Sequence, residues 1–435
     1  MAYPFAFKRL LARTGLSCFF PSLDRQADGA GPFLHYYADR VLAAPLDDLE
    51  LAARFWEATA PDVIDLARAE PRVDLAASAG TRLPVDRRGT PPPWGSSELR
   101  RAVADWLFVD DHISVDPVEE VLITHGASGA FGAVADAFVN PGTRVVLFDP
   151  TSPLFPAMLR QRRARLRWVP TWVQDGRVRF RPESLAKALR GARLLVLADP
   201  VNPTGAVFSP EDLELIAWWA SRHDVLVVQD DTFARYRYEG ERRHLATFPV
   251  MSQRIIAIGS ASKGYGLSPA RVGWLAGHRH LVRPCALTQA LTTPFVPTLC
   301  QQLALAALRR SEEAFTPIRV EFASRRQYVV ERLQVLGLNP SRPAGGYFLW
   351  LPIYQFGIDG RTFAGRLLES KKVLVRPGEL YGPGGIGFVR LSYAAEEGRL
   401  LEGLARLAEF LPGLQPPVAR LVPEEAPADE PVWKG

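Results

Sequence analysis

The chain has 435 residues, 47% of them hydrophobic and 23% charged, which is the composition of a globular protein with one large core and a smaller one. Its net charge of +5 is small for this length, and no run approaches the roughly 20 apolar residues that span a bilayer, so neither a nucleic acid nor a membrane is an expected partner. Three cysteines without a CxxC pair indicate unpaired thiols in a reducing compartment, for which the cytoplasm is the default expectation.

Residues 1–75 show a mixed pattern and are expected to pack against a small domain near the end of the chain. The next segment, 76–330, is a succession of short apolar runs, each of which ends at a polar or glycine-containing turn. Several runs are continuous rather than alternating, as expected for strands that are buried on both faces of a sheet. Strands are predicted at 121–124, 144–149, 194–199, 225–230, 255–260 and 272–276.

Helical patterns lie between these predicted strands, for example at 130–140 and 212–223. The second helix is preceded by Ser209, and Asp212 completes a capping box three residues later. Alternation of strands and helices predicts an α/β fold in which helices cover both faces of a mostly parallel sheet. Residues 76–330 are therefore predicted to form one large domain.

The pattern changes at about residue 331, and residues 331–414 are predicted to form a separate α+β domain. Strands are predicted at 346–351, 373–376 and 388–393, and a closing helix at 397–410. The last segment, 415–435, is rich in Pro, Glu and Ala and has little to bury, so we expect a disordered tail.

Polar and basic residues directly follow the predicted strands, at the edge of an α/β sheet where ligands bind. The segments are Thr124-His125-Gly126-Ala127-Ser128, Asn202-Pro203-Thr204-Gly205, Asp230-Asp231 and Ser260-Ala261-Ser262-Lys263, with Arg271 and Arg390 farther along the chain. Each segment alone can be explained by a purely structural role, since Asn-Pro-Thr-Gly is typical of a turn and Ser128 can cap a helix. The order and spacing of all these segments together are far more specific than any one segment.

This set resembles the class I/II aminotransferases, a family of fold-type I pyridoxal-phosphate enzymes, and the resemblance runs from about residue 65 to residue 410. It implies a mostly parallel seven-stranded sheet flanked by helices, with the smaller α+β domain beside it. It also implies the cofactor pyridoxal 5'-phosphate, transfer of an amino group from an L-amino acid to a 2-oxo acid, and a homodimer with active sites at the subunit interface.

The residue types at these positions suit that chemistry. A lysine forms a reversible Schiff base with an aldehyde cofactor and afterwards moves a proton, and the resemblance gives this role to Lys263. By the same resemblance, Asp230 faces the pyridine nitrogen and keeps it protonated. Asn202 is the donor to the cofactor's 3-oxygen and borders the substrate, and Arg390 binds the substrate α-carboxylate unless it is only a strand-edge arginine.

The cofactor phosphate needs several hydrogen-bond donors and positive charge. Ser260, Ser262 and Arg271 are the candidates that flank Lys263 in the sequence. Ala127 and Ser128 lie at the start of the predicted helix, where backbone N–H groups point outward and bind anions. Together these residues are expected to hold the phosphate.

Three positions depart from the resembling family. Thr90 stands where a tyrosine usually reaches the partner subunit's phosphate, Ser152 where an aromatic ring usually stacks on the cofactor, and Phe233 where a tyrosine usually donates to the 3-oxygen. Phe155 or His125 are candidates for the missing ring. These departures leave two alternatives open: another pyridoxal-phosphate reaction, such as that of a β-lyase, cyclising synthase or decarboxylase, and a low-turnover binding or regulatory protein.

Other signals concern the substrate and possible metals. The segment 290–297 carries no arginine that could pair with a second substrate carboxylate, which favours an apolar or aromatic substrate. His278 and His280 have no ligand-spaced acidic or cysteine partners, so no metal site is expected. The glycine-rich segment 382–387 precedes a strand instead of a helix and is interpreted as a loop.

Overall fold

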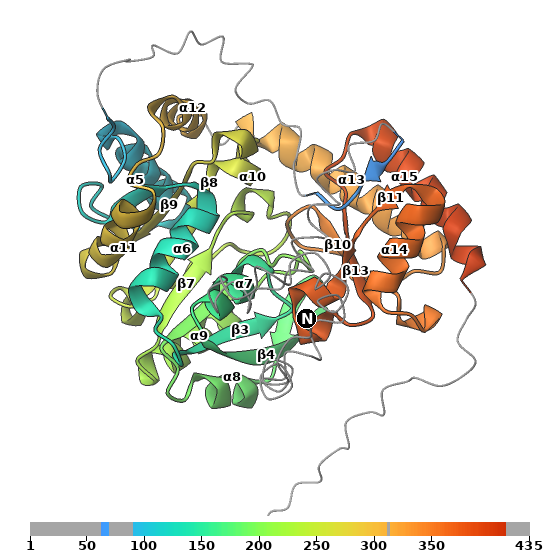
Figure 1. Ribbon diagram of the computed structural model, residues 1–435, viewed down its shortest axis with the longest axis horizontal. Helices are drawn as coiled ribbons and strands as arrows, with labels where there is room; N and C mark the ends of the chain where they lie inside the picture. Colours follow the sequence, from blue (N-terminus) through green and yellow to red (C-terminus); the bar gives the residue numbers. More distant parts are fainter. Residues whose placement is uncertain (1–61, 69–89, 311–313, 415–435) are drawn as a thin grey trace, which may run out of the picture.

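The computed structural model describes residues 62–68, 90–310 and 314–414 (Figure 1). They form two units that lie side by side, one around a large sheet and a smaller one, orange to red, around a three-stranded sheet. The tail predicted at 415–435 and most of the segment 1–75 fall outside the described residues. Within the described ranges, every helix is too short or too polar to cross a bilayer.

The large sheet has eight strands in the order β2-β9-β8-β7-β6-β3-β4-β5. Their bounds are β2 Val121–Thr124, β3 Arg144–Asp149, β4 Arg165–Gln174, β5 Arg177–Phe180, β6 Leu194–Ala198, β7 Leu226–Asp230, β8 Ile255–Ser260 and β9 Gly273–Gly277. Strands β8, β7, β6, β3 and β4 are parallel neighbours, whereas β9 is antiparallel to β8 and β2. The predicted α/β fold with a mostly parallel sheet is confirmed.

One strand more than the expected seven is present, because β5 pairs antiparallel with the end of β4. The two strands are joined by Asp175 and Gly176, whose φ angles are 50° and 71°. An Asp-Gly pair with both φ angles positive forms the tight turn that suits the twist of a β-hairpin. This local turn adds the eighth strand at the edge of the sheet.

Helices cover both faces of the large sheet (Figure 1). Their bounds are α5 Ser97–Asp111, α6 Gly126–Phe138, α7 Leu154–Gln161, α8 Pro182–Leu189, α9 Pro210–Arg222, α10 Ala261–Gly264, α11 Arg279–Thr292 and α12 Thr298–Leu308. Along β3, Val145 and Leu147 pack with α6, α7 and α11, while Val146 and Phe148 pack with α8 and α9. The strand is therefore apolar from Val145 to Phe148, as its continuous pattern predicted, and only its last residue, Asp149, is buried and polar.

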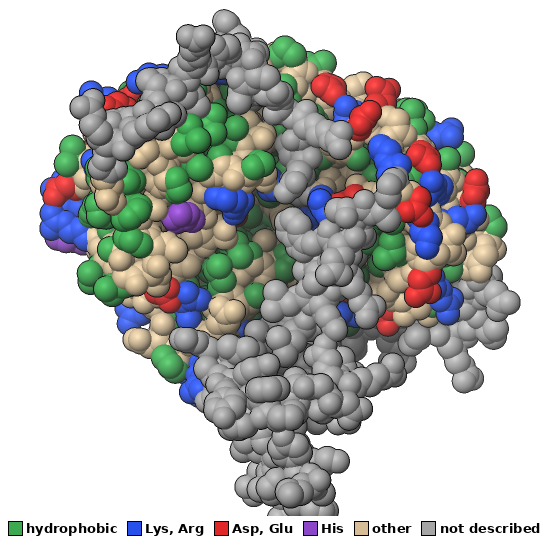
Figure 2. All heavy atoms as spheres, turned by 45° about the horizontal axis from the view of Figure 1, so that its top comes forward, with side chains coloured by type: hydrophobic (Ala, Val, Ile, Leu, Met, Phe, Trp, Pro, Cys, Tyr) green, Lys and Arg blue, Asp and Glu red, His purple; other side chains and the backbone are tan. Residues whose placement is uncertain are grey.

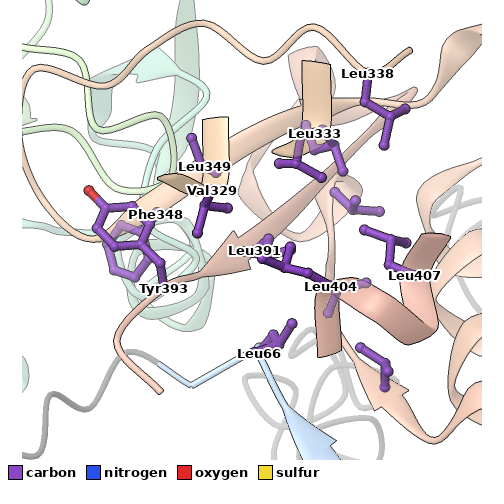
Figure 3. Packing of buried hydrophobic residues seen from close by; sticks show 14 of the residues in the cluster. Leu66, Val329, Leu333, Leu338, Phe348, Leu349, Leu391, Tyr393, Leu404 and Leu407 are labelled. Atoms are coloured by element: carbon purple, nitrogen blue, oxygen red, sulfur yellow. The ribbon is translucent and has the colours of Figure 1, made fainter. Parts of the chain in front are cut away.

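The smaller unit is built on the antiparallel sheet β10-β13-β12. Its elements are α13 Thr316–Val335, β10 Phe348–Pro352, α14 Gly360–Lys371, β11 Val373–Leu374, β12 Arg376–Pro377, β13 Phe388–Ser392 and α15 Glu397–Phe410. The short strand β1 (Ile64–Asp65) pairs parallel with β11, so a segment from near the start of the chain joins this unit. Figure 3 shows Leu66 beside Leu391 and Leu404 in the shared core.

Side chains on the small sheet alternate between two faces, as they do on any β-strand. Leu349, Val389 and Leu391 lie in the core with α13, α14 and α15 (Figure 3). The residues between them therefore point to the other face, and these include Trp350 and Arg390. One face of the sheet thus holds the smaller unit together and leaves the other face free for the site.

The two units meet at the carboxyl ends of the strands of the large sheet. The backbone N–H of Thr151, just after β3, donates to the carbonyl oxygen of Tyr381 at 2.8 Å. The N–H of Gly345 donates to the carbonyl oxygen of Gly205 at 2.8 Å, and the Tyr238 hydroxyl donates to the carbonyl oxygen of Gly346 at 2.6 Å. Backbone contacts therefore fix the small sheet beside the edge where the large sheet binds ligands.

A glycine inside β8 gives a test of this packing. A Cβ atom on Gly259 would lie 2.3 Å from the indole of Trp274, which is buried and cannot withdraw. We expect Gly259→Ala to lower the free energy of unfolding by about 3 kcal/mol, the cost of an overpacked core. Gly132→Ala on α6 is the control, because its Cβ meets nothing within 4 Å. Equal melting temperatures for the two variants would contradict this account.

Candidate active site

Most of the predicted residues come together at one edge of the large sheet, formed by the carboxyl ends of β6, β7 and β8 and the amino end of the antiparallel β9. Asp230 is the last residue of β7, Lys263 lies in the short helix α10 after β8, and Arg271 precedes β9. Asn202 lies in the loop after β6, and α6 begins two residues after β2. Since β6, β7, β8 and β9 are adjacent in the sheet, these side chains reach one common site.

Arg271 joins the residues expected to hold a phosphate. One terminal nitrogen of its guanidinium lies 3.3 Å from the Ser128 hydroxyl and the other lies 3.4 Å from the Ser262 hydroxyl. The guanidinium also lies over Gly126, where an added Cβ would be 2.9 Å from the terminal nitrogen. The first N–H groups of α6, Ala127 included, have no acceptor within the helix. Positive charge, hydroxyls and N–H groups therefore converge on one place.

Ser260 has a structural role at the same site. Its hydroxyl accepts a hydrogen bond from the N–H of Ser262 at 3.1 Å, which caps α10. The same hydroxyl donates to the carbonyl oxygen of Val272 at 3.3 Å. Ser260 thus fixes the helix that carries Lys263. Its contact with a phosphate stays a prediction.

Lys263 is half-buried at the centre of this arrangement. Its Nζ donates to the Ser268 hydroxyl at 3.4 Å, and its carbonyl oxygen accepts a hydrogen bond from the Tyr236 hydroxyl at 3.3 Å. The backbone of the lysine is therefore held while its amine points into the site, where it can reach an electrophile.

Asp230 is a buried carboxylate with no cationic partner among the described residues. Its Oδ1 accepts hydrogen bonds from the N–H of Thr232 at 2.9 Å and from the Thr232 hydroxyl. Burial raises the pKa of Asp230 to about 6; the hydrogen bonds from Thr232 oppose this rise, and the nearby Asp231 makes a smaller contribution to it. In the described part of the chain, Oδ2 takes no hydrogen bond. A protonated ring nitrogen placed against Oδ2 would supply the missing donor and the missing charge.

Asp231, which follows it, is engaged elsewhere. Its two carboxylate oxygens bind the Gln229 amide at 3.0 Å and Nε2 of His244 at 3.0 Å. The Nδ1 atom of His244 accepts from the N–H of Ala246, so Nε2 carries the proton toward Asp231. Asp231 therefore anchors the loop behind the site.

Arg390 is a buried cation that lacks an acidic partner. It is 2% exposed, and it donates to Asn202 Oδ1 at 2.8 Å and to the carbonyl oxygen of Ala67 at 2.6 Å. Its Nε is buried and makes no hydrogen bond. Burial lowers the pKa of Arg390 to about 10, because no carboxylate of the described residues forms an ion pair with it. The side chain is placed to receive an anion.

The three departures from the resembling family have separate surroundings. The Phe233 ring packs edge-on against Tyr347 and Phe348, with ring centres 5.4 and 5.1 Å apart. Its approach to a cofactor stays a prediction, as do the consequences of Thr90 and Ser152. Of the two rings suggested as substitutes, Phe155 is buried against Phe131 in the large core, and the His125 ring lies 3.1 Å from the carbonyl oxygen of Phe295.

Two residues near Arg390 were missed by the sequence analysis. Tyr381 lies with its ring centre 5.3 Å from the guanidinium carbon, and its buried hydroxyl has no hydrogen-bond partner. Arg376 is opposite Arg390 in the register of β12 and β13. The sequence did contain a signal for Arg376: the apolar Val375 just before β12 lies in the core, so its neighbour in an extended segment points to the other face.

The fold and these side chains define the fold-type I class of pyridoxal-phosphate enzymes. This cofactor needs an amine, a carboxylate for its ring nitrogen and a phosphate cradle, which Lys263, Asp230 and the cluster of Arg271, Ser128 and Ser262 would supply. The residues present therefore fit the cofactor. The described residues contain no group of three or more His, Cys, Asp or Glu side chains that could bind a metal ion.

The chain belongs to the class I and II aminotransferase family, whose model matches residues 57–407. It is 29% identical to an aspartate aminotransferase of Pyrococcus abyssi, over 80% of this chain and 92% of that protein. It is 31% identical to an aspartate/prephenate aminotransferase of Thermus thermophilus, over 80% and 91% of the two chains. The structure of an aromatic aminotransferase from Pyrococcus horikoshii superimposes with a TM-score of 0.77, at 29% identity over 81% of this chain and 96% of that one.

Asp149, at the end of β3, is a second buried carboxylate near the site. Its Oδ2 accepts a hydrogen bond from the N–H of Gly384 at 2.8 Å, and its Oδ1 is buried without a partner. An added Cβ on Gly382 would lie 2.4 Å from Oδ1, so only a glycine loop fits here. The segment 382–387 is therefore a loop, as interpreted from the sequence, and it closes over the carboxyl group. Burial raises the pKa of Asp149 to about 6.

This raised pKa predicts a pH-dependent stability. The native pKa of about 6 exceeds the ordinary value of 3.8, so the carboxyl stabilises the fold below about pH 4 and this contribution is lost as pH rises through 6. Asn at this position does not titrate. We expect the free energy of unfolding of Asp149→Asn, relative to the unmodified protein, to increase by on the order of 2 kcal/mol from pH 4 to pH 8. A difference that is constant with pH in denaturant titrations would refute it.

Proposed function

We propose that this pyridoxal-phosphate-dependent aminotransferase moves an amino group from an L-amino acid to a 2-oxo acid at the site formed by Lys263, Asp230, Asn202 and Arg390. The observation that carries the proposal is the pair of buried, uncompensated charges. Arg390 has no acidic partner and Asp230 no basic partner among the described residues, so each suits one charged group of a bound molecule. The other reactions and the binding role considered from the sequence receive no support from relatives, which are named as aminotransferases.

Arg390 orients the substrate in this proposal. A planar guanidinium binds a carboxylate through two parallel hydrogen bonds, and Nε with one terminal nitrogen gives the required pair. The Nε atom is the one without a partner, while Asn202 and the carbonyl oxygen of Ala67 hold the other end of the group. The substrate α-carboxylate is thereby fixed, which positions its Cα–H bond relative to Lys263.

Lys263 moves the proton. When bound, pyridoxal phosphate supplies an aldehyde carbon for covalent attachment and a ring that accepts electrons from the substrate. The Lys263 amine would hold that aldehyde carbon, and when free of it would take a proton from the substrate carbon and return it at a neighbouring position. Ser268 accepts a hydrogen bond from the Lys263 amine at 3.4 Å, which orients the amine in the site.

Asp230 and the Arg271 cluster hold the cofactor at its two ends. Asp230 carries the negative charge that keeps the ring nitrogen protonated, and an opposite charge there would lower the carboxylate pKa from its raised value. Arg271, Ser128, Ser262 and the N–H groups at the start of α6 bind the phosphate. Ser260 and Phe233 complete the proposed cofactor site.

Replacement of Lys263 is the direct test of this function. Lys263→Ala should bind the cofactor without covalent attachment, so that borohydride reduction no longer fixes it to the protein, and turnover should fall by at least about a thousandfold. Lys187→Ala on α8 is the matched control, because Lys187 is exposed and distant in the sequence from the site. Mass spectrometry of the reduced protein and an amino-acid panel give the two readouts. Normal turnover by Lys263→Ala would exclude the proposal.

We further propose that the protein is a homodimer. Large apolar side chains are exposed along one stretch of the surface, namely Leu287 at 63%, Leu291 at 79%, Phe295 at 37% and Leu299 at 45%. The first two lie one turn apart on α11, and the others continue toward α12. Apolar patches of this kind mark protein–protein contacts. Figure 2 shows further apolar side chains exposed on one half of the molecule.

The dimer proposal predicts an effect of charge on this patch. Leu287→Glu combined with Leu291→Glu should shift the sedimenting mass from about twice 48.1 kDa to that of one chain. Val335→Glu, at a position 79% exposed on α13, should leave the dimer intact. A dimer that survives both glutamates would exclude this patch, and a fully active monomer of the unmodified protein would exclude the dimer.

We also propose the domain boundaries and the cellular location. We place a small domain at residues 331–414, with residues 1–75 packing on it and a tail from 415, beside a large domain at 76–330. The helix α13 (Thr316–Val335) runs unbroken across residue 330, so the junction follows this helix rather than a loop. The three cysteines without a paired motif support a cytoplasmic location.

A further inference from the structure

Arg376 lies beside Arg390 on the face of the small sheet that borders the site. The two are direct partners in the antiparallel pair β12 and β13, so their side chains point to the same face. Trp350 is opposite Arg390 on the third strand and shares this face. The neighbours Val375 and Val389 lie in the core on the opposite face. The alternation of the strands therefore directs Arg376 toward the site.

Arg376 has no partner of its own. It forms no hydrogen bond or ion pair with any residue in the described ranges, and its Nε is buried without an acceptor. Its terminal nitrogens are not among the buried atoms that lack a partner, so they keep contact with solvent. The guanidinium end therefore borders an accessible space, while its stem is enclosed.

The placement of two arginines side by side needs an explanation. Like charges directly opposite each other on neighbouring strands destabilise a sheet. Here the charge of Arg376 adds to burial in lowering the pKa of Arg390. Asp65, which also acts on Arg390, is itself paired with Arg68 at 2.7 Å. The pocket thus has an excess of positive charge that a single substrate carboxylate leaves uncompensated.

We propose that Arg376 binds a second acidic group of the substrate, so that the preferred amino donor is a short dicarboxylic amino acid. This inference rests on the proposed function, in which Arg390 binds the α-carboxylate. Directly opposed residues of an antiparallel pair are roughly 5 Å apart, which suits two carboxylates separated by two or three carbons. The sequence analysis favoured an apolar substrate because it sought the second arginine at 290–297, whereas β12 supplies it.

Aromatic residues surround Arg390. Trp350 stacks on Phe388, with ring centres 5.1 Å apart and planes at 8°, and its ring lies 5.5 Å from that of Tyr381. Arg390 itself lies over the Phe348 ring at 4.1 Å. The Phe348 and Tyr381 rings enclose the Arg390 guanidinium, which is 2% exposed, and so strengthen its attraction for a carboxylate.

The test compares donors that differ in the second acid. Arg376→Gln should lower the ratio of kcat/KM for aspartate or glutamate to kcat/KM for leucine by about 10- to 100-fold, the loss of one charge-assisted contact. Arg376→Lys should give an intermediate ratio, because it keeps a charge without the planar fork. Arg366→Gln on α14, which packs on the other face of the small sheet, is the matched control and should leave the ratio unchanged. Thermal unfolding confirms that each variant is folded.

A second measurement separates this inference from the proposed function. Succinate, a dicarboxylate that cannot donate an amino group, should bind the holoenzyme and lose about 10-fold or more in affinity in Arg376→Gln. Equal succinate affinity in the two proteins, or an equal fall in kcat/KM for aspartate and leucine, would overturn the role of Arg376. Preference of the unmodified enzyme for leucine would overturn it as well, while leaving transamination intact. Absence of turnover with every donor would instead exclude the proposed function, and succinate binding would still decide the role of Arg376.

Discussion

Two buried charges of opposite sign, the carboxylate of Asp230 and the guanidinium of Arg390, have no counter-ion among the described residues. Buried charges destabilise a protein unless they are paired. Each of these two charges therefore favours a bound molecule that places an opposite charge beside it. Asp230 ends a central strand of the large sheet, and Arg390 lies in the middle strand of the small one. The distance between the two sheets therefore sets where cofactor and substrate can lie together.

The contacts between the units keep this arrangement in place. Backbone hydrogen bonds from Thr151 to Tyr381 and from Gly345 to Gly205 join loops of the two units next to the site. The Asp149 carboxylate accepts from Gly384 in a space that admits no side chain on the facing glycines. Because these contacts use backbone atoms and glycines, they specify geometry without adding a group that competes for a substrate anion. Rigid support of this kind is what orientation in catalysis needs.

The sequence predicted those parts of the site that depend on local pattern. Continuous apolar runs are strands buried on both faces, and the residues that follow them, such as Asp230 and Lys263, must then meet at one edge of the sheet. The position of Arg376 depends instead on the pairing of β12 with β13, a long-range register that no window of sequence contains. Strand β5 was not predicted, although the Asp175-Gly176 pair is a typical sequence of a hairpin turn. The contact of Phe233 with Tyr347 could not be predicted, because it depends on tertiary packing.

The proposed cofactor contacts and the proposed substrate contacts lie on different sheets, and this separation affects substrate specificity. Lys263, Asp230 and Arg271, which hold the cofactor in the proposed site, are all attached to the large sheet and depend on its buried strands. The proposed substrate contacts, Arg376 and Arg390, lie on β12 and β13, where alternate positions face the site and can change without disturbing the core behind them. A charge at position 376 can therefore select the donor while the proton-transfer machinery stays the same. One fold can serve different substrates when the residues that select a substrate lie apart from those that carry out the chemistry.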